Sequence, residues 1–134
     1  MLVEIKWNNT WNDGSITILK PGAVYDRRYH RCLLDYHYDE VRDYHFGISK
    51  DTYNRLFIVI NHFGKLVDKH PLGHRVYEMP EGSAEILQDI IDLDWRYSER
   101  IDAILDTIGF MSRWEDIASA IDSEALVVKA AEAL

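Results

Sequence analysis

The sequence predicts a single α+β domain, in which an N-terminal antiparallel β-meander of four or five strands precedes helices packed on one face of the sheet. Apolar and polar residues alternate in residues 1–48, with turn dipeptides between the alternating runs. Apolar residues recur at helical spacing in residues 49–134. The length of 134 residues and the apolar content of 47% are those of one ordinary globular domain.

The first two strands are predicted from a period of two. Residues Val3–Trp7 alternate between apolar and polar, as expected for a strand with one buried face. Asp13-Gly14 then favours a tight hairpin turn, because Gly adopts positive φ without a Cβ clash. A second strand is therefore expected over residues 15–20, and Pro21-Gly22 indicates the turn that follows it.

Residues 34–48, LDYHYDEVRDYHFGI, read almost as a mirror image about their centre. A hairpin at this point would place His37 opposite His45, and Asp39 opposite Asp43, on one face. The other face would carry tyrosines, phenylalanine and leucine. Apolar positions also step by four and three along the segment, so a helix is the alternative, and the sequence leaves both open.

This cluster of histidines and carboxylates suggests two kinds of chemistry. Two imidazoles and a carboxylate such as Asp39 form a ligand set for a divalent ion. His37 and His45 would also suit proton transfer, because free histidine titrates near neutral pH. A small metal- or His-dependent enzyme is therefore one functional alternative. The same side chains would equally occur on a solvated hairpin face, so no metal ligand, cofactor or catalytic residue is assigned.

The first helix is predicted over residues 50–68. Ser49 is placed to cap it, and apolar side chains fall on one stripe along it. The sequence HPLG ends this helix, and one short strand is expected over residues 75–80.

A long helix is predicted over residues 83–108, with Ser83 as its cap and Gly109 after its last turn. Its apolar seam steps by three and four and comprises Ile86, Ile90, Leu93, Tyr97, Ile101, Ile104 and Ile108. The seam would pack on the first helix of the same chain or on its own copy across a two-fold axis. The sequence leaves a homodimer open.

The C-terminal residues 112–134 predict two short helices. Ser112 and Glu115 form a capping box, and Asp122-Ser123 is expected to start the last helix. This order is that of a helix-turn-helix, but the second helix offers a single cation, Lys129, for reading DNA. The prediction is a helical hairpin packed on the core.

Net charge is divided unevenly along the chain. Of the total of −8, residues 1–78 contain 11 Lys and Arg against 10 Asp and Glu, whereas residues 79–134 contain 4 against 13. On the predicted long helix, the side opposite the apolar seam carries Glu85, Asp89, Asp92, Glu99 and Asp106. Such a face suits a protein partner with a basic surface and argues against a nucleic-acid partner, although a solvated surface is the alternative.

Basic residues gather in the segment KPGAVYDRRYHR, residues 20–31. Arg27, Arg28 and Arg31 alternate with tyrosines there, and guanidinium groups bind phosphates and carboxylates well. The segment is therefore a candidate anion-binding or nucleic-acid-binding site. The alternative is pairing with the protein's own acidic residues.

The combined features favour a small non-enzymatic protein-binding or regulatory module. No catalytic or phosphate-binding motif occurs, and one cysteine permits no intramolecular disulfide. No apolar run approaches the length of a membrane span and no signal peptide is visible, so a cytoplasmic protein without a membrane partner is expected. Small acidic proteins of phages and mobile elements often inhibit host enzymes, which makes an inhibitor of that origin one form of this expectation.

Overall fold

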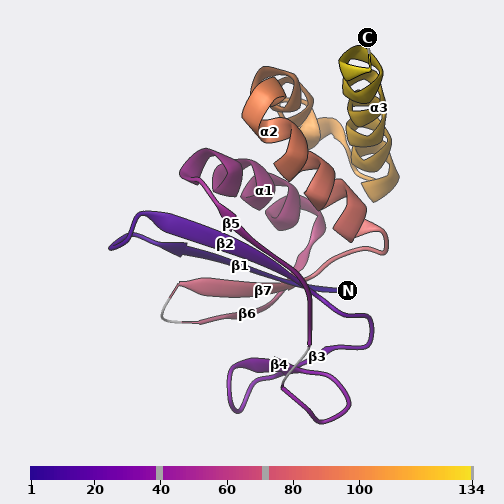
Figure 1. Cartoon of the computed structure of the whole chain (residues 1–134). Helices are drawn as coiled ribbons and strands as arrows, with labels where there is room; N and C mark the ends of the chain where they lie inside the picture. Colours follow the sequence, from indigo (N-terminus) through magenta and orange to yellow (C-terminus); the bar gives the residue numbers. More distant parts are fainter. Residues whose placement is uncertain (39–40, 71–72, 134) are drawn as a thin grey trace. The chain divides into compact units, whose positions relative to one another are not determined.

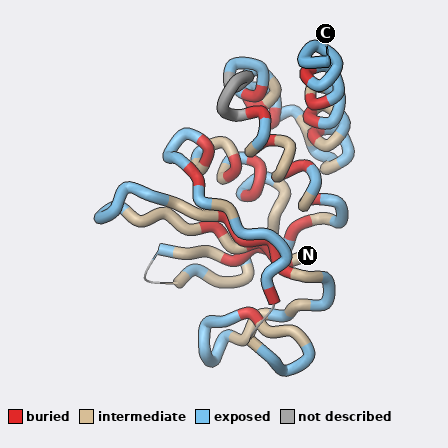
Figure 2. The backbone as a smooth tube through the Cα atoms, viewed as in Figure 1, coloured by how far each residue is buried: buried red, intermediate tan, exposed pale blue. Residues whose placement is uncertain are grey.

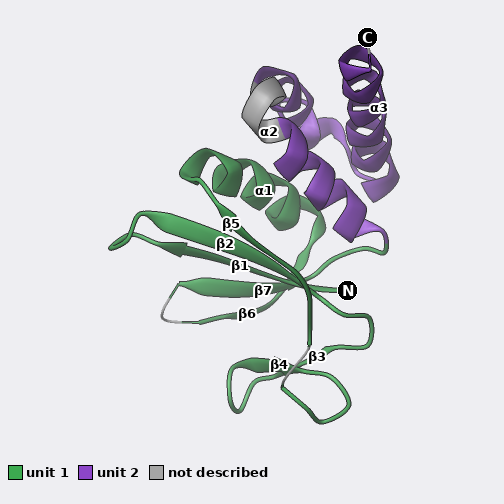
Figure 3. Ribbon diagram, in the orientation of Figure 1, with its two compact units in different colours: residues 1–81 green, residues 82–134 purple. Residues whose placement is uncertain are grey.

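The computed structural model describes residues 1–38, 41–70 and 73–133; for residues 94–98 it describes the backbone only. The described residues form two compact units, unit 1 from Met1 to Glu81 and unit 2 from Gly82 to Leu134 (Figure 3). An antiparallel sheet followed by helices confirms the predicted α+β class. Figure 2 shows buried residues concentrated in the sheet and in stripes along the helices, while hairpin tips are exposed.

Unit 1 contains all the strands of the described residues and the helix α1. In chain order these elements are β1 (Leu2–Asn8), β2 (Asp13–Leu19), β3 (Val24–Asp26), β4 (Arg31–Leu33), β5 (Arg42–Ile48), α1 (Lys50–Phe63), β6 (Lys65–Lys69) and β7 (His74–Glu78). Five strands form a large antiparallel sheet in the order β5-β2-β1-β7-β6, and β3 and β4 form a separate hairpin. The first two strands of the chain are thus at the centre of the sheet, unlike in a simple meander.

One face of the large sheet is apolar and packs on α1 (Figure 1). Because alternate residues of a strand share a face, Ile5 of β1, Ile16 of β2 and Tyr77 of β7 lie together, each almost fully buried. The Ser49 hydroxyl caps α1 by accepting from the Thr52 amide, as predicted. Apolar burial on this face is the main source of stability in unit 1.

The second face of the sheet is polar except at one end. There, the β3–β4 hairpin lies against it, opposite α1 (Figure 1). The contact is an apolar cluster of five buried residues, which we call the seat: Leu2, Leu19, Cys32, Val41 and Val76. The remainder of this face presents the polar side chains of β1, β2, β5 and β7.

Both edge strands of the large sheet contain a β-bulge. In β5, Tyr44 pairs with Ile18 but Arg42 pairs with Leu19, so Asp43 is the extra residue. In β6, the extra residue lies between Leu66 and Asp68. A bulge reverses the alternation of side chains beyond it, which places Arg42 and Asp68 on the polar second face.

The mirrored segment forms neither the predicted hairpin nor the alternative helix. Leu34 and His37 bond to each other through both backbone groups, in a turn whose central residues Asp35 and Tyr36 have φ of 51° and 65°. This turn directly follows β4, the second strand of the β3–β4 hairpin. His45, in contrast, lies on β5 opposite Thr17 of β2. His37 therefore lies outside both sheets, in the turn after β4, whereas His45 belongs to the large sheet. Asp39, and with it the predicted facing of Asp39 and Asp43, lies outside the described residues.

The first helix is shorter than predicted, because it ends at Phe63 and not at residue 68. The Gly64 amide closes the last turn on the Ile60 carbonyl, and a Cβ at Gly64 would lie only 2.5 Å from that oxygen. The chain then continues as β6, so Val67 of the predicted helical stripe belongs to a strand. Two strands, β6 and β7, occur where one was expected.

Unit 2 is helical, with α2 (Ser83–Leu105), a short 3-10 helix η1 (Ile108–Phe110) and α3 (Trp114–Glu132). The predicted long helix exists but ends at Leu105, and Gly109 belongs to η1 and not to its C-terminus. Gly82, with φ of 81°, precedes α2 without a side-chain cap, so Ser83 is its first residue and not its cap. Helix α3 likewise begins without the predicted capping box.

The predicted break at Asp122-Ser123 is wrong, because α3 is one continuous helix. Its buried stripe, Ile117, Ile121, Ala125 and Val128, runs through this point, and α3 packs on α2. Asp122 and Ser123 are exposed, so they continue the polar side of an amphipathic helix. Within the described residues, no helix combines the length and apolar character required to cross a membrane.

The continuity of α3 predicts a strong effect of proline at its centre. Ser123→Pro removes a helical hydrogen bond and should lower the free energy of unfolding by about 3 kcal/mol, measured by urea denaturation. Ser123→Ala, which keeps the helix intact, should change it by less than about 0.5 kcal/mol. Equal stability of the two variants would show that α3 is interrupted at this point.

Candidate functional site

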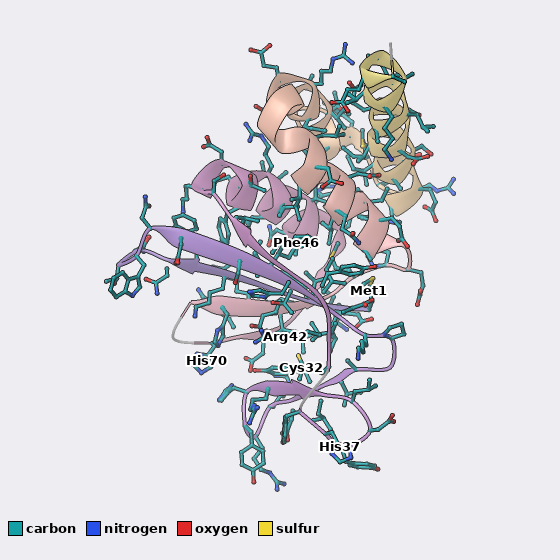
Figure 4. The ribbon with its side chains drawn as sticks, viewed as in Figure 1. Met1, Cys32, His37, Arg42, Phe46 and His70 are labelled. Carbon is teal, nitrogen blue, oxygen red and sulfur yellow. The ribbon has the colours of Figure 1, made fainter. Side chains whose placement is uncertain are left out.

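A cleft of about 190 Å³ lies in unit 1 where the β3–β4 hairpin meets the polar face of the large sheet. Its polar lining comes from both sides, with Glu4, Thr17, Arg42 and His74 from the sheet and His30, Arg31, Cys32 and Tyr38 from the hairpin segment. Figure 4 shows Arg42 and Cys32 in this region, with Phe46 on the opposite side of the sheet. Guanidinium, imidazole and hydroxyl groups thus converge on one small space.

Arg31 is held by stacking, and it forms no ion pair with any residue that the structure describes. Its guanidinium carbon lies 4.4 Å from the centroid of the Tyr38 ring. The Tyr38 hydroxyl donates to Asp26 Oδ2 at 2.9 Å, which fixes the ring. The pKa of Asp26 is lowered: desolvation by burial would raise it, but this hydrogen bond and the one from the Arg28 amide outweigh that effect. Asp26, the cross-strand neighbour of Arg31, therefore orients Tyr38 and leaves the guanidinium available.

Arg42 lines the cleft and also an adjoining hollow of about 480 Å³. The hollow extends along the polar face past Lys6, Ser15 and His45 to the exposed indole of Trp11. Among the described residues, neither Arg42 nor Arg31 forms an ion pair with a carboxylate. Two exposed guanidinium groups with unused donors are therefore present at this site.

Thr17 and His45 form a polar pair on the face beside Arg42. The Thr17 hydroxyl is buried and lies 2.7 Å from His45 Nδ1, so the imidazole is fixed in position. Its Nε2 makes no hydrogen bond within the described part of the chain. This nitrogen is therefore the one that a ligand would meet.

A second polar cluster attaches the hairpin to β6. Asp68 Oδ2 accepts from the Tyr25 hydroxyl at 2.7 Å and lies 3.2 Å from His30 Nδ1. The hydrogen bond from Tyr25 lowers the pKa of Asp68, with smaller contributions from the Lys69 amide and His30. Burial, followed by this hydrogen bond, raises the pKa of Tyr25. The cluster therefore depends on an ionised Asp68.

Three histidines meet beside this cluster. The ring centroids of His30 and His70 are 5.0 Å apart, and those of His70 and His74 are 4.3 Å apart. Burial lowers the pKa of His74, so its ring is neutral at neutral pH. No group of three His, Cys, Asp or Glu side chains within the described ranges has an arrangement that could hold a metal ion.

The predicted arginine patch is divided by the structure. Arg27 Nη2 donates to the Val67 carbonyl at 2.7 Å, so it ties the hairpin to β6. Arg28 is exposed at the hairpin turn, and Arg31 alone of the three lines the cleft. His37 lies at the far side of the hairpin from Arg42 (Figure 4). The structure therefore brings Arg31 together with Arg42, which was not among the predicted site residues.

The five acidic residues that were predicted to share one side of the long helix lie on α2 in unit 2. Glu85, Asp92, Glu99 and Asp106 follow one another at seven-residue spacing, and all four are exposed. None of these four forms an ion pair with a residue that the structure describes. Asp89 differs, because it is half-buried and its pKa is raised by burial, with Lys129 opposing and Asp122 reinforcing that shift. We call the four exposed carboxylates the acidic row.

Comparison with known proteins finds no matching family model, no curated protein and no solved structure with significant similarity to this chain. The functional assignment therefore depends on the residues and their geometry alone.

Cys32 is predicted to resist alkylation in the folded protein. Burial, and then the charge of Glu4, raises the pKa of its thiol from 9.0 to about 11, which lowers the thiolate fraction about a hundredfold. Iodoacetamide labelling at mildly alkaline pH, followed by mass spectrometry, should be at least that much slower than in urea-unfolded protein. Comparable rates in the two states would contradict the burial of Cys32 in the seat.

Tyr25→Phe should weaken the attachment of the hairpin in a pH-dependent way. The pKa of folded Asp68 is below its ordinary value of 3.8, so its interactions stabilise the protein above that pH. The stability lost in Tyr25→Phe should therefore be greatest at neutral pH and diminish as pH falls through the pKa of folded Asp68. Urea denaturation across this range measures it, with the exposed Tyr29→Phe as control. A loss that is independent of pH would exclude the ionised Asp68 as the partner.

Proposed function

We propose that this chain is a non-enzymatic protein-binding module that presents the acidic row of α2 to a basic surface of a partner protein. The observation that carries the proposal is the row itself, four exposed carboxylates at seven-residue spacing without ion pairs among the described residues. Successive members are about 10 Å apart along the helix, so the row extends about 30 Å. Such a length suits an extended charged interface.

The partition of charge between the units supports the proposal. Unit 1 contains 11 Lys and Arg and 11 Asp and Glu, whereas unit 2 contains 4 and 12. The whole net charge of −8 therefore belongs to unit 2. Two of its cations are engaged internally, since Arg100 pairs with Glu124 at 2.7 Å and Arg113 with Glu115 at 3.6 Å. The acidic row is left to attract a basic partner.

The position of Asp106 is unfavourable for the helix itself. It lies at the C-terminal end of α2, where the helix dipole is negative, and the last turn contains no basic residue. Folding alone would favour Lys or Arg at this end. A local cost of this kind is typical of residues retained for an external contact.

Exposed apolar side chains in the same unit would add contact area. Phe110 of η1 is 91% exposed, and Leu126 and Val127 of α3 are also exposed. Interfaces combine such apolar anchors with charged groups around them. Unit 2 thus offers both components that a protein partner requires.

Basic surfaces of the kind that would match the acidic row are common on proteins that bind nucleic acid. We infer that a protein of this class is the partner, and that occupation of its basic surface would inhibit it. A His-dependent enzyme is not favoured, because His37 lies in the turn after β4 and does not pair with His45, which faces Thr17 of β2.

The proposal predicts that charge reversal in the acidic row weakens partner binding. Bait protein captures partners from a lysate of the native host, mass spectrometry identifies them, and the purified partner is titrated with each variant. Asp92→Lys combined with Glu99→Lys should weaken binding at least about tenfold, and added salt should weaken the wild-type complex.

The control is Asp116→Lys combined with Glu132→Lys, an equal change of charge on α3. It should weaken binding less than the row variant. Equal effects of the two double variants, or no effect of either, would contradict the acidic row as the interface.

A further inference from the structure

The cleft of unit 1 concentrates positive charge at its mouth. Arg31 comes from the β3–β4 hairpin and Arg42 from β5 of the large sheet, so the two guanidinium groups belong to opposite walls. Both are exposed, whereas Glu4, the one carboxylate among the described lining residues, is half-buried. Burial has the larger effect on the pKa of Cys32 and on that of His74, and Glu4 is close enough to both groups for its charge to act upward on each pKa. An anion would therefore be attracted at the mouth.

Arg31 is already oriented for such a ligand. Its stacking on Tyr38, which Asp26 holds, restricts the guanidinium before any ligand binds. A planar group with parallel N–H donors forms paired hydrogen bonds with phosphate oxygens. Less conformational entropy is lost on binding when the donor is fixed in advance.

Arg42 owes its position to the bulge in β5. Regular alternation would have placed it on the apolar face with Tyr44, but the extra residue Asp43 directs it to the cleft. Beside it, the His45 imidazole is fixed by the Thr17 hydroxyl, 2.7 Å from its Nδ1, and adds a polar group on the same face. A bulge that carries a basic residue into a cleft is typical of a functional position.

We propose that this cleft binds the phosphate group of a small phosphomonoester between the guanidinium groups of Arg31 and Arg42. The rest of the ligand would occupy the adjoining hollow of about 480 Å³, which shares Arg42 with the cleft and ends at the Trp11 indole. A phosphomonoester suits two guanidinium groups because it carries close to two negative charges. This site lies in unit 1 and is independent of the acidic row.

The test is an NMR titration of the full-length protein, labelled with ¹⁵N, with inorganic phosphate and with adenosine 5′-monophosphate. Both should shift the amide signals of Thr17, Arg31 and Arg42 with millimolar dissociation constants. Arg31→Ala and Arg42→Ala should each weaken binding of the nucleotide about three- to tenfold. Arg31→Lys keeps the charge but loses the planar fork, so it should also weaken binding.

Arg28→Ala is the matched control, because it removes the same charge from the same hairpin outside the cleft. It should change affinity less than about twofold, as a distant exposed charge is screened. Thermal melting of each variant verifies that the fold is intact, as expected for exposed arginines.

Three results would overturn the proposal. The first is no shift of these amides with phosphate or nucleotide up to about 10 mM, the limit of weak specific binding. The second is an equal loss of affinity in Arg28→Ala, Arg31→Ala and Arg42→Ala. The third is binding of a single-stranded oligothymidylate without binding of the monophosphate, which would assign the arginines to a nucleic-acid backbone.

Discussion

The seat formed by Leu2, Leu19, Cys32, Val41 and Val76 is the interaction on which the arrangement of unit 1 depends. It holds the β3–β4 hairpin against one end of a sheet face whose remainder is polar. A hairpin of two three-residue strands would be marginal alone, so its position depends on this apolar contact, to which hydrogen bonds from Tyr25 and Arg27 to β6 are added. Because the seat covers only one end of the face, a cleft remains beside it, and the side chains of hairpin and sheet meet there.

Sequence patterns predicted where strands and helices form better than they predicted which strands pair with each other. Alternation in β1 and β2, the Ser49 cap and the acidic spacing on α2 are local features, and the structure contains them. The cleft could not be predicted, because Arg42 reaches it through a bulge that breaks alternation. The hairpin predicted for the mirrored segment does not form, because the chain turns earlier, at Asp35 and Tyr36. Both residues have positive φ although neither is glycine, so nothing in the sequence indicated this turn.

The two units present surfaces of opposite character. Unit 1 is neutral and presents arginines and histidines around a cleft, whereas unit 2 carries the net negative charge along α2. In the β unit, edge-strand bulges direct Arg42 and Asp68 onto the polar face. Within the described residues, no ion pair with a carboxylate engages Arg31 or Arg42. In the helical unit, Arg100 and Arg113 pair with glutamates, whereas the acidic row forms no ion pair with a residue that the structure describes. The proposed ligand site and the proposed partner surface thus lie in separate parts of the chain.

The seat is tested most directly by nuclear Overhauser contacts in the full-length protein with labelled leucine and valine methyl groups. Packing of the hairpin on the sheet predicts cross-peaks that link Cys32 of the hairpin to the methyl groups of Leu2, Leu19 or Val76. Cross-peaks within the large sheet, such as those among Leu2, Leu19 and Val76, serve as the internal reference. Intact contacts within the sheet, with none between hairpin and sheet, would contradict the seat and the cleft that depends on it.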